Sequence, residues 1–190
     1  MASVVDICNR ALNLIGQSTI ADLTEVTPVA QKLNLMWPNL RDSVLRSHPW
    51  NCAAERVTLA RLGSTPAWGF SFEYQLPTDC LRVVKIDPDA NYSVEGRKLR
   101  CDQEELDLLY VKRLEDSTQY DSELAEAFSF QLAAELSFSE TGSTSLLDYL
   151  QTRAIEKLAD ARSADAREGT PEDPRVSSWL NAKLGKRSLF

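Results

Sequence analysis

The chain has 190 residues, of which 43% are hydrophobic and 26% are charged. This composition is ordinary for a soluble globular protein, so it excludes disorder throughout, and the length favours one large domain or one domain with arms. Acids outnumber bases by 28 to 21, and the net charge of −7 argues against a general affinity for nucleic acid.

The charges are unevenly distributed along the chain. The stretch from Asp102 to Glu126 holds nine acids against two bases, Lys112 and Arg113, and so carries the whole net charge of −7. The last stretch, from residue 175 to residue 190, holds four bases and no acid. An acidic middle and a basic end are an asymmetry that the function has to explain.

Targeting and disulfide signals are not expected. Asp6 and Arg10 interrupt the apolar pattern of the first 16 residues, which rules out a signal peptide, and no apolar run is long enough for a membrane span. The cysteines are widely spaced without a CxxC pair, so we predict small buried apolar residues in a reducing cytoplasm. They are Cys8, Cys52, Cys80 and Cys101.

Two helices are predicted near the start of the chain. Residues 3–15 have apolar side chains at helical spacing, and Ser3 with Asp6 resembles a capping box. Thr27 followed by Pro28 is a strong start signal for a second helix, which ends near residue 48. Pro38 lies inside it and is expected to kink or split the helix, because proline removes a backbone donor and clashes with the preceding turn.

The middle of the chain has a β pattern. From Phe70 to Leu76 apolar and polar residues alternate, so one face of that strand is expected to be buried and the other exposed. Further strands are predicted up to Ile86 and from Leu106 to Val111. Tyr92 to Cys101 is predicted to form a hairpin that turns near residues 95 and 96.

Helices are predicted again from Ser122. The first of them has apolar residues on two sides, so we expect it to be packed on two sides. A short Thr141-Gly142-Ser143 link leads into a last helix, from Thr144 to about Ala166, and makes the pair an antiparallel hairpin. Two prolines then precede a segment that we interpret as an arm.

The order of these elements predicts an α+β fold. We expect an antiparallel α-helical bundle formed by the N- and C-terminal helices, with a central β-rich insertion and an extended C-terminal arm. The expected divisions are residues 1–55 for the N-terminal helices and 56–115 for the insertion, then 116–168 for the helical hairpin and 169–190 for the arm.

No catalytic, cofactor-binding or metal-binding motif stands out. His48 is the only histidine, and it lies at a predicted helix end, where local hydrogen bonds commonly fix such a ring. No nucleophile elbow and no phosphate-binding glycine loop accompany it. We therefore expect no enzyme and no cofactor, and a hydrolase that uses His48 is the enzymatic alternative.

The C-terminal stretch combines apolar and basic residues outside the predicted core. Tryptophan and arginine are the residue types that anchor interfaces, so we expect an arm that grips a partner and folds on contact. Docking back on the chain's own helices is the alternative. The predicted contacts are Arg175, Trp179, Leu180, Lys183, Leu184, Lys186, Arg187 and Phe190.

Several stretches follow one another in a familiar order. They are Ile7 to Gly16, Arg41 to Asn51, Leu76 to Val83, Val94 to Leu99 and Leu132 to Leu136, with Ser178-Trp179-Leu180 near the end. In order and spacing they resemble the tail tubular protein A family, the head-to-tail adaptors or gatekeepers of short-tailed bacteriophages and related prophages. The resemblance covers most of the chain.

The resemblance implies a structural protein of the virion, at the head–tail junction, made in the cytoplasm of the bacterial host. Such adaptors form a ring, typically of twelve copies, beneath the portal protein, and offer a platform for the next tail protein, a nozzle or tail-tube component. DNA passes through the channel without specific binding. A negative lumen would repel phosphate, so Asp102, Glu104, Glu105 and Asp107 are the candidate channel surface. Acids that face outward for solubility are the alternative.

Two other classes are weighed against an adaptor. An assembly chaperone or scaffold would use the same arm to hold a partner transiently, and would be absent from the finished particle. A sequence-specific DNA-binding module is the least favoured class, because no basic recognition helix is predicted.

Overall fold

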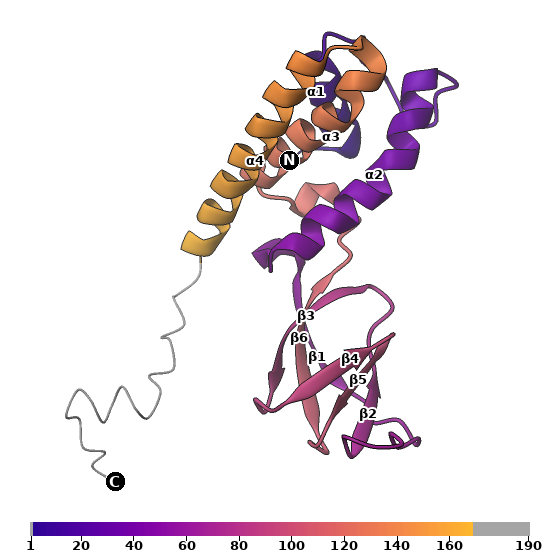
Figure 1. Cartoon of the computed structure of the whole chain (residues 1–190), viewed down its shortest axis with the longest axis vertical. Coiled ribbons are helices and arrows are strands. Elements are labelled where there is room, and N and C mark those ends of the chain that lie inside the picture. The colour runs from indigo at the N-terminus through magenta and orange to yellow at the C-terminus, as the bar shows by residue number, and fades with distance from the viewer. Residues whose placement is uncertain (1, 169–190) are drawn as a thin grey trace, which may run out of the picture.

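The computed structural model describes residues 2–168 and shows a mixed α+β chain, as expected (Figure 1). In this part of the chain the helices are α1 (Val4–Leu14), α2 (Pro28–Ser47), α3 (Ser122–Thr141) and α4 (Thr144–Arg167). The strands are β1 (Ala54–Leu59), β2 (Phe72–Gln75), β3 (Cys80–Asp87), β4 (Tyr92–Glu95), β5 (Lys98–Cys101) and β6 (Leu106–Lys112). Two 3-10 turns, Asn51–Ala53 and Ser117–Gln119, precede β1 and α3. The predicted arm, residues 169–190, lies outside the described residues.

The helices gather at one end of an elongated molecule and the strands at the other (Figure 1). The buried apolar residues accordingly form two clusters, one among the helices and one between the strands. We call these two regions the helical part and the β part. The expected division between residues 55 and 56 falls inside β1, and the one between residues 115 and 116 falls shortly after β6.

Helix ends follow from local sequence. The Ser3 hydroxyl accepts from the backbone N–H of Asp6, and the Asp6 carboxylate accepts from the backbone N–H of Ser3 at 2.9 Å, which confirms the capping box. Thr27 caps α2 by accepting from the backbone N–H of Ala30. Gly142 has a φ of 67°, a left-handed conformation that ends α3 and lets α4 fold back beside it.

Pro38 does not split the second helix. The α2 helix is continuous from Pro28 to Ser47, with Pro38 in its interior. Pro38 and Asn34, one turn earlier, are both exposed, so water can reach the carbonyl that the missing N–H leaves unpaired. The opposite side of α2 holds the buried residues that fix the helix to the rest of the helical part, among them Leu33, Trp37 and Val44.

The helical part is organised around α3, which contacts α1, α2 and α4. Phe128 of α3 is fully buried, and its ring centroid lies 5.2 Å from that of Trp37 and 5.1 Å from that of Tyr120. Ala133 and Leu136 of α3 are also fully buried. A helix packed on more than one side was predicted from its two apolar stripes, and this prediction is confirmed.

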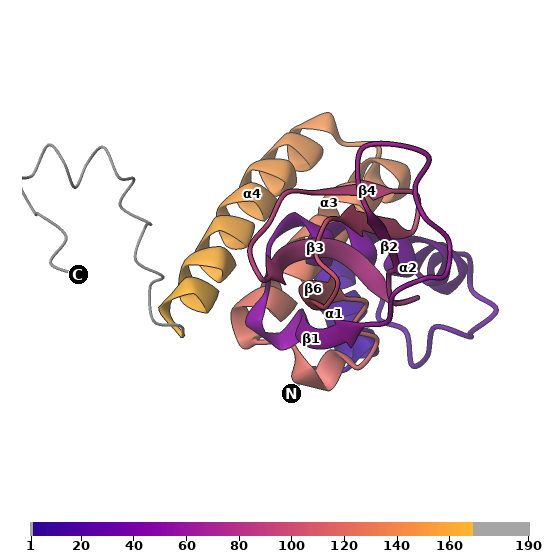
Figure 2. The same ribbon diagram turned by 90° about the horizontal axis from the view of Figure 1, so that it is seen from below.

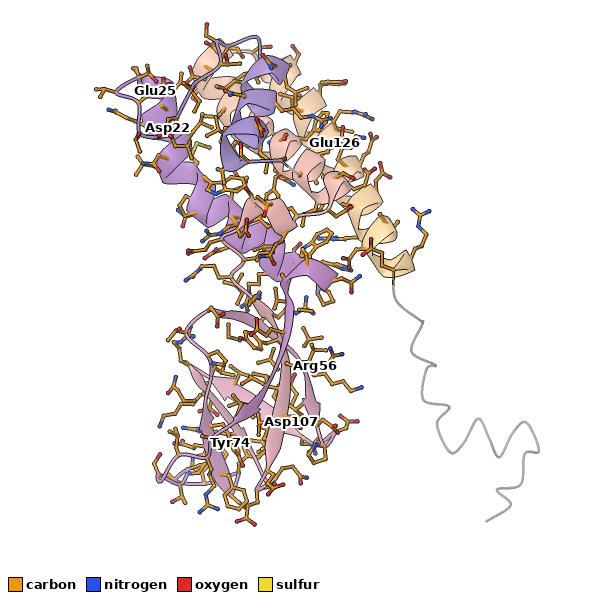
Figure 3. The ribbon with its side chains drawn as sticks, turned by 180° about the vertical axis from the view of Figure 1, so that it is seen from behind. Asp22, Glu25, Arg56, Tyr74, Asp107 and Glu126 are labelled. Atoms are coloured by element: carbon orange, nitrogen blue, oxygen red, sulfur yellow. The ribbon has the colours of Figure 1, made fainter. Side chains whose placement is uncertain are left out.

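The β part consists of two antiparallel three-stranded sheets. In the first, β6 lies between β1 and β3, and in the second, β5 lies between β2 and β4. Residues of both sheets share one core, in which Tyr74 and Leu99 are fully buried and Leu108 nearly so. Figure 3 shows Tyr74 near the end of the β part away from the helices.

The predicted hairpin is formed by β4 and β5. Glu95 pairs with Lys98, so the connecting loop consists of Gly96 and Arg97 alone. Gly96 has a φ of 62°, the conformation that the first position of a type II′ hairpin turn requires. The turn therefore lies one residue later than the centre that the sequence indicated.

The strict alternation expected from Phe70 to Leu76 is wrong. The β2 strand begins only at Phe72, and the adjacent residues Glu73 and Tyr74 are exposed by just 3% and 0%. Tyr74 faces the apolar core, whereas Glu73 is covered by charged side chains of the neighbouring β5 strand. The side chains of Glu73 and Tyr74 are therefore buried on opposite faces by different kinds of contact, while Gln75 at the end of the strand is exposed.

Two adjacent strands join the β part to the helical part. Ala54 at the start of β1 pairs with Val111 near the end of β6, so the chain enters and leaves the β part at neighbouring positions. Arg113, just after β6, donates its Nε–H to the Asp42 carboxylate of α2 at 2.7 Å. Arg46 of α2 donates to a backbone carbonyl of β3. The C-terminal half of α2 therefore contacts β3 and the residue that follows β6, which fixes it against the first sheet.

Candidate interaction surfaces

The four predicted channel acids lie together at the end of the β part away from the helices. Asp102, Glu104 and Glu105 belong to the turn between β5 and β6, and Asp107 is the second residue of β6. All four are exposed. Figure 3 shows Asp107 in the β part, well separated from Glu126 in the helical part.

Local contacts hold three of these acids in place. Asp102 accepts hydrogen bonds from the backbone N–H and the hydroxyl of Ser71, at 2.8 and 2.9 Å. Asp107 accepts from the Thr58 hydroxyl at 2.6 Å, across the β1–β6 pair. An ion pair joins Glu104 to Arg61, at 3.3 Å. Within residues 2–168, Arg61 is thus the cation that pairs with one of these three carboxylates.

Two further acids extend this surface, and sequence reasoning missed both. Asp87 ends β3 and lies opposite Asp107 in the β3–β6 register, and Asp89 follows two residues later. Both are exposed. The sequence indicated that a strand ends near residue 87, but it did not indicate that this strand pairs with β6, which carries Asp107. We call Asp87, Asp89, Asp102, Glu104, Glu105 and Asp107 the acidic end.

The remainder of the acidic stretch lies elsewhere and has local structural roles. Asp116 caps the 3-10 turn before α3, and Asp121 caps α3 itself. Glu126 forms ion pairs with Arg10 at 2.5 Å and with Lys157 at 3.3 Å, which link α3 to α1 and α4. The 25-residue stretch from Asp102 to Glu126 is thus divided between the two parts of the molecule and does not form one surface.

Glu73 is the most buried carboxylate of the β part, and sequence reasoning missed it. Its oxygens accept from Lys98 Nζ at 2.8 Å, from Arg100 Nε at 2.9 Å and from the Ser64 hydroxyl at 2.9 Å. The hydrogen bond from Lys98, followed by that from Ser64, holds the pKa of Glu73 below its ordinary value. This cluster binds β2 to β5 and leaves no vacant charge for a ligand.

A basic groove lies where α2 meets the edges of both sheets. Arg46, Arg82 and Arg97 line it, and each donates to a backbone carbonyl and has no carboxylate partner among the described residues. The groove has a volume of about 470 Å³ and includes Tyr92 and Val94 of the edge strand β4, which are 40% and 43% exposed. These three positive charges stand out in a chain with a net charge of −7.

His48 joins the ends of α2 and α4. Its Nε2 lies 3.1 Å from the Asp165 carboxylate, and its ring packs edge-on against Trp50 with centroids 4.7 Å apart. The same carboxylate accepts from the backbone N–H of Asn51 at 2.9 Å. The arrangement fastens the last turn of α4 to the α2–β1 connection, the kind of local role expected for a helix-end histidine.

The cysteines are poor nucleophiles in this fold. Cys8 and Cys101 are buried and Cys52 and Cys80 are partly buried, so the prediction of buried residues holds fully for two of the four. Burial raises the pKa of Cys8 to about 12 and that of Cys52, which is near His48 in sequence, to about 11. Very little thiolate is therefore present at neutral pH.

No family model matches the chain, and no curated protein matches it.

Between residues 2 and 168, no group of three or more histidine, cysteine, aspartate or glutamate side chains could hold a metal ion. No helix in that range is long and apolar enough to cross a membrane. The predicted arm contacts, from Arg175 to Phe190, lie outside the described residues. The surfaces that the structure does place are therefore the acidic end, the basic groove and the outer faces of the helices.

Proposed function

We propose that this protein is a structural head-to-tail adaptor of a tailed bacteriophage. In this proposal it assembles into a ring of about twelve copies under the portal protein, at the head–tail junction of the virion. The ring forms part of the DNA channel and a platform for the next tail protein, and the chain has no catalytic role.

The observation that carries the proposal is the acidic end of the β part. Six exposed carboxylates come together there from two chain segments, residues 87–89 and residues 102–107. Repeated around a ring, this surface would give a strongly negative wall. DNA phosphates are repelled by such a wall, so packaged DNA could slide past it without adhering.

The arrangement of the chain supports the proposal in a second way. The N- and C-terminal helices share one core, and the β part is inserted between them, as the resemblance to the adaptor family implies. The expected bundle would form the body of the ring. The basic, apolar segment from Arg175 to Phe190 would reach from the end of this body to the portal.

The deciding experiment is the mass of the purified protein with and without its cognate portal, by native mass spectrometry. A ring in either condition supports the adaptor function, and a comparison of the two shows whether the portal templates assembly. A monomer that ignores the portal contradicts it and favours a transient chaperone or scaffold. Counting copies in finished virions separates these classes further, because an adaptor is present at a fixed number and a chaperone is absent.

A further inference from the structure

The outer face of α4 exposes apolar residues that the fold does not use. Ile155 is 68% exposed and Tyr149 is 59% exposed, and Thr152 and Ala159 on the same side are also exposed. The opposite side of α4 packs against α3 through buried residues such as Leu150 and Ala154. Helix periodicity therefore directs Tyr149, Thr152, Ile155 and Ala159 away from the core, with the exposed Glu156 beside them.

The outer face of α2 has a similar character. Leu35 is 75% exposed, and Pro38 and Asn39, which lie on the same side about one turn further along, are exposed as well. Val26, just before the helix, is 90% exposed. The opposite face, with Leu33, carries the buried residues of this helix.

These two faces lie on different sides of the helical part. Figures 1 and 2 show α4 along one side and α2 along another, and α3 contacts both helices. The two helices also run in the same direction, because both end beside the β part, where Asp165 of α4 approaches His48 after α2. A rotation about the long axis of the molecule would therefore bring α4 of one copy alongside α2 of the next, with the helices parallel.

The charges that flank the two faces are complementary in the same register. On α4, Asp148 and Asp160 are exposed and have no ion-pair partner among the described residues. They are about 18 Å apart along the helix axis, because twelve residues separate them. On α2, Lys32 and Arg46 are exposed and about 21 Å apart, with Leu35 between them. Parallel packing of the two helices places Asp148 near Lys32 and Asp160 near Arg46. It also places Ile155 near Leu35, between these charged pairs.

We propose that the outer face of α4 in one copy packs against the outer face of α2 in a second copy. Such a contact joins different surfaces of identical chains, so each copy keeps one free face and assembly continues until a ring closes. Lys32 already bonds Glu140 in its own chain and Arg46 a carbonyl of β3, and each has further N–H groups to offer. The inference rests on the proposed ring and names the contact between its subunits.

The experiment blocks one face at a time. Ile155→Glu places a charge in the middle of the α4 face, and Leu35→Glu does the same on α2; both sites are exposed, so unchanged circular dichroism and thermal midpoints are expected. Trp68→Glu in the loop before β2, where the side chain is 85% exposed and lies outside the named surfaces, is the matched control. Assembly is read by native mass spectrometry, for each variant alone and for an equal mixture, with and without portal.

The expected result is that each blocked variant remains monomeric where the unmodified protein and Trp68→Glu form rings. The mixture should stop at a one-to-one pair, since one intact α4 face meets one intact α2 face. If either blocked variant still forms rings, the proposed α4–α2 contact is contradicted, but the proposed ring is not. If Leu35→Glu or Ile155→Glu forms dimers by itself, a contact between like faces replaces the one proposed. If the unmodified protein does not assemble in any condition, both the contact and the adaptor function are wrong.

Discussion

Arg100 lies directly opposite Glu73 in the β2–β5 pair, and its Nε–H donates to the Glu73 carboxylate at 2.9 Å. Lys98, two residues earlier on the same strand, donates to the other oxygen at 2.8 Å. Glu73 is thereby held between two cations on the face of the second sheet that does not meet the apolar core. We therefore expect the second sheet to depend on this carboxylate for its stability, because both cations lose their shared partner without it.

Replacing Glu73 by glutamine is expected to lower the thermal unfolding midpoint of the protein. The change keeps the shape of the side chain but leaves Lys98 and Arg100 without their shared anion. Glu95→Gln is the control, because Glu95 also pairs with Arg100 but its side chain is 54% exposed. Differential scanning calorimetry should show a clearly larger fall for Glu73→Gln, and equal falls would contradict the role given to the buried cluster.

The same carboxylate makes stability depend on pH. The pKa of Glu73 is lowered in the folded protein, so the unfolded chain takes up its proton at a higher pH than the folded chain does. The stabilisation is therefore present above the ordinary glutamate pKa of about 4.3 and is lost as the pH falls below it toward the folded pKa. Asp6, Asp22 and Asp116 act in the same direction. Urea unfolding at pH 7 and at lower pH should show Glu73→Gln losing less stability on acidification than the unmodified protein, and parallel losses would argue against this linkage.

Truncating Phe128 tests the centre of the helical core. Phe128→Ala removes a fully buried ring that contacts Trp37 and Tyr120, and is expected to cost about 3–5 kcal/mol of unfolding free energy. Phe138→Ala on the same helix, where the ring is 55% exposed, should stay within about 0.5 kcal/mol of the unmodified protein. Denaturant unfolding measures both, and similar costs would mean that the core is placed incorrectly.

Neutralising the predicted channel acids tests the proposed role of the acidic end. Asp102→Asn, Glu104→Gln, Glu105→Gln and Asp107→Asn together keep hydrogen-bond acceptors and remove four negative charges. If these residues face the lumen, phages that carry the four changes should eject DNA more slowly, since phosphates would no longer be repelled there. Glu115→Gln, at an exposed residue, together with Glu123→Gln, at a partly exposed one, is the control, because both lie outside the acidic end. Unchanged ejection in the first set would assign these acids to solubility alone.

Removing residues 175–190 tests the arm. We expect the shortened protein to keep its thermal midpoint and its helical content, because the buried apolar clusters formed by residues 2–168 remain in it. Binding to the portal should be lost, as measured by co-sedimentation. A full-length variant with Trp179 and Leu180 changed to serine is the matched comparison. It shows whether portal binding needs these apolar side chains or only the presence of the segment. If the shortened protein binds the portal as well as the full chain does, the portal-binding surface lies elsewhere on the molecule.

Features set by neighbouring residues could be predicted from the sequence. The capping box depends on two residues three positions apart, Ser3 and Asp6, and the two-sided burial of α3 follows from its own apolar periodicity. The end of α3 at Gly142 is likewise a local property. Such features need no knowledge of what the element packs against.

Features set by pairing between distant segments could not be predicted. The alternation in β2 indicated an exposed Glu73, because nothing local shows that Lys98 and Arg100 lie on the adjacent strand. For the same reason the sequence predicted four of the six residues of the acidic end. Asp87 lies beside Asp107 only through the β3–β6 register. Pro38 shows the reverse case, in which a strong local signal is offset by the packing of the opposite side of the helix.

The pairing of Ala54 with Val111 places the two ends of the β part side by side. A segment whose ends are adjacent can be lengthened, shortened or exchanged without moving the chain on either side of it. The helices can therefore keep their mutual contacts while the β part changes in size or surface between related proteins. The helical part and the surface that the β part presents can therefore diverge at independent rates.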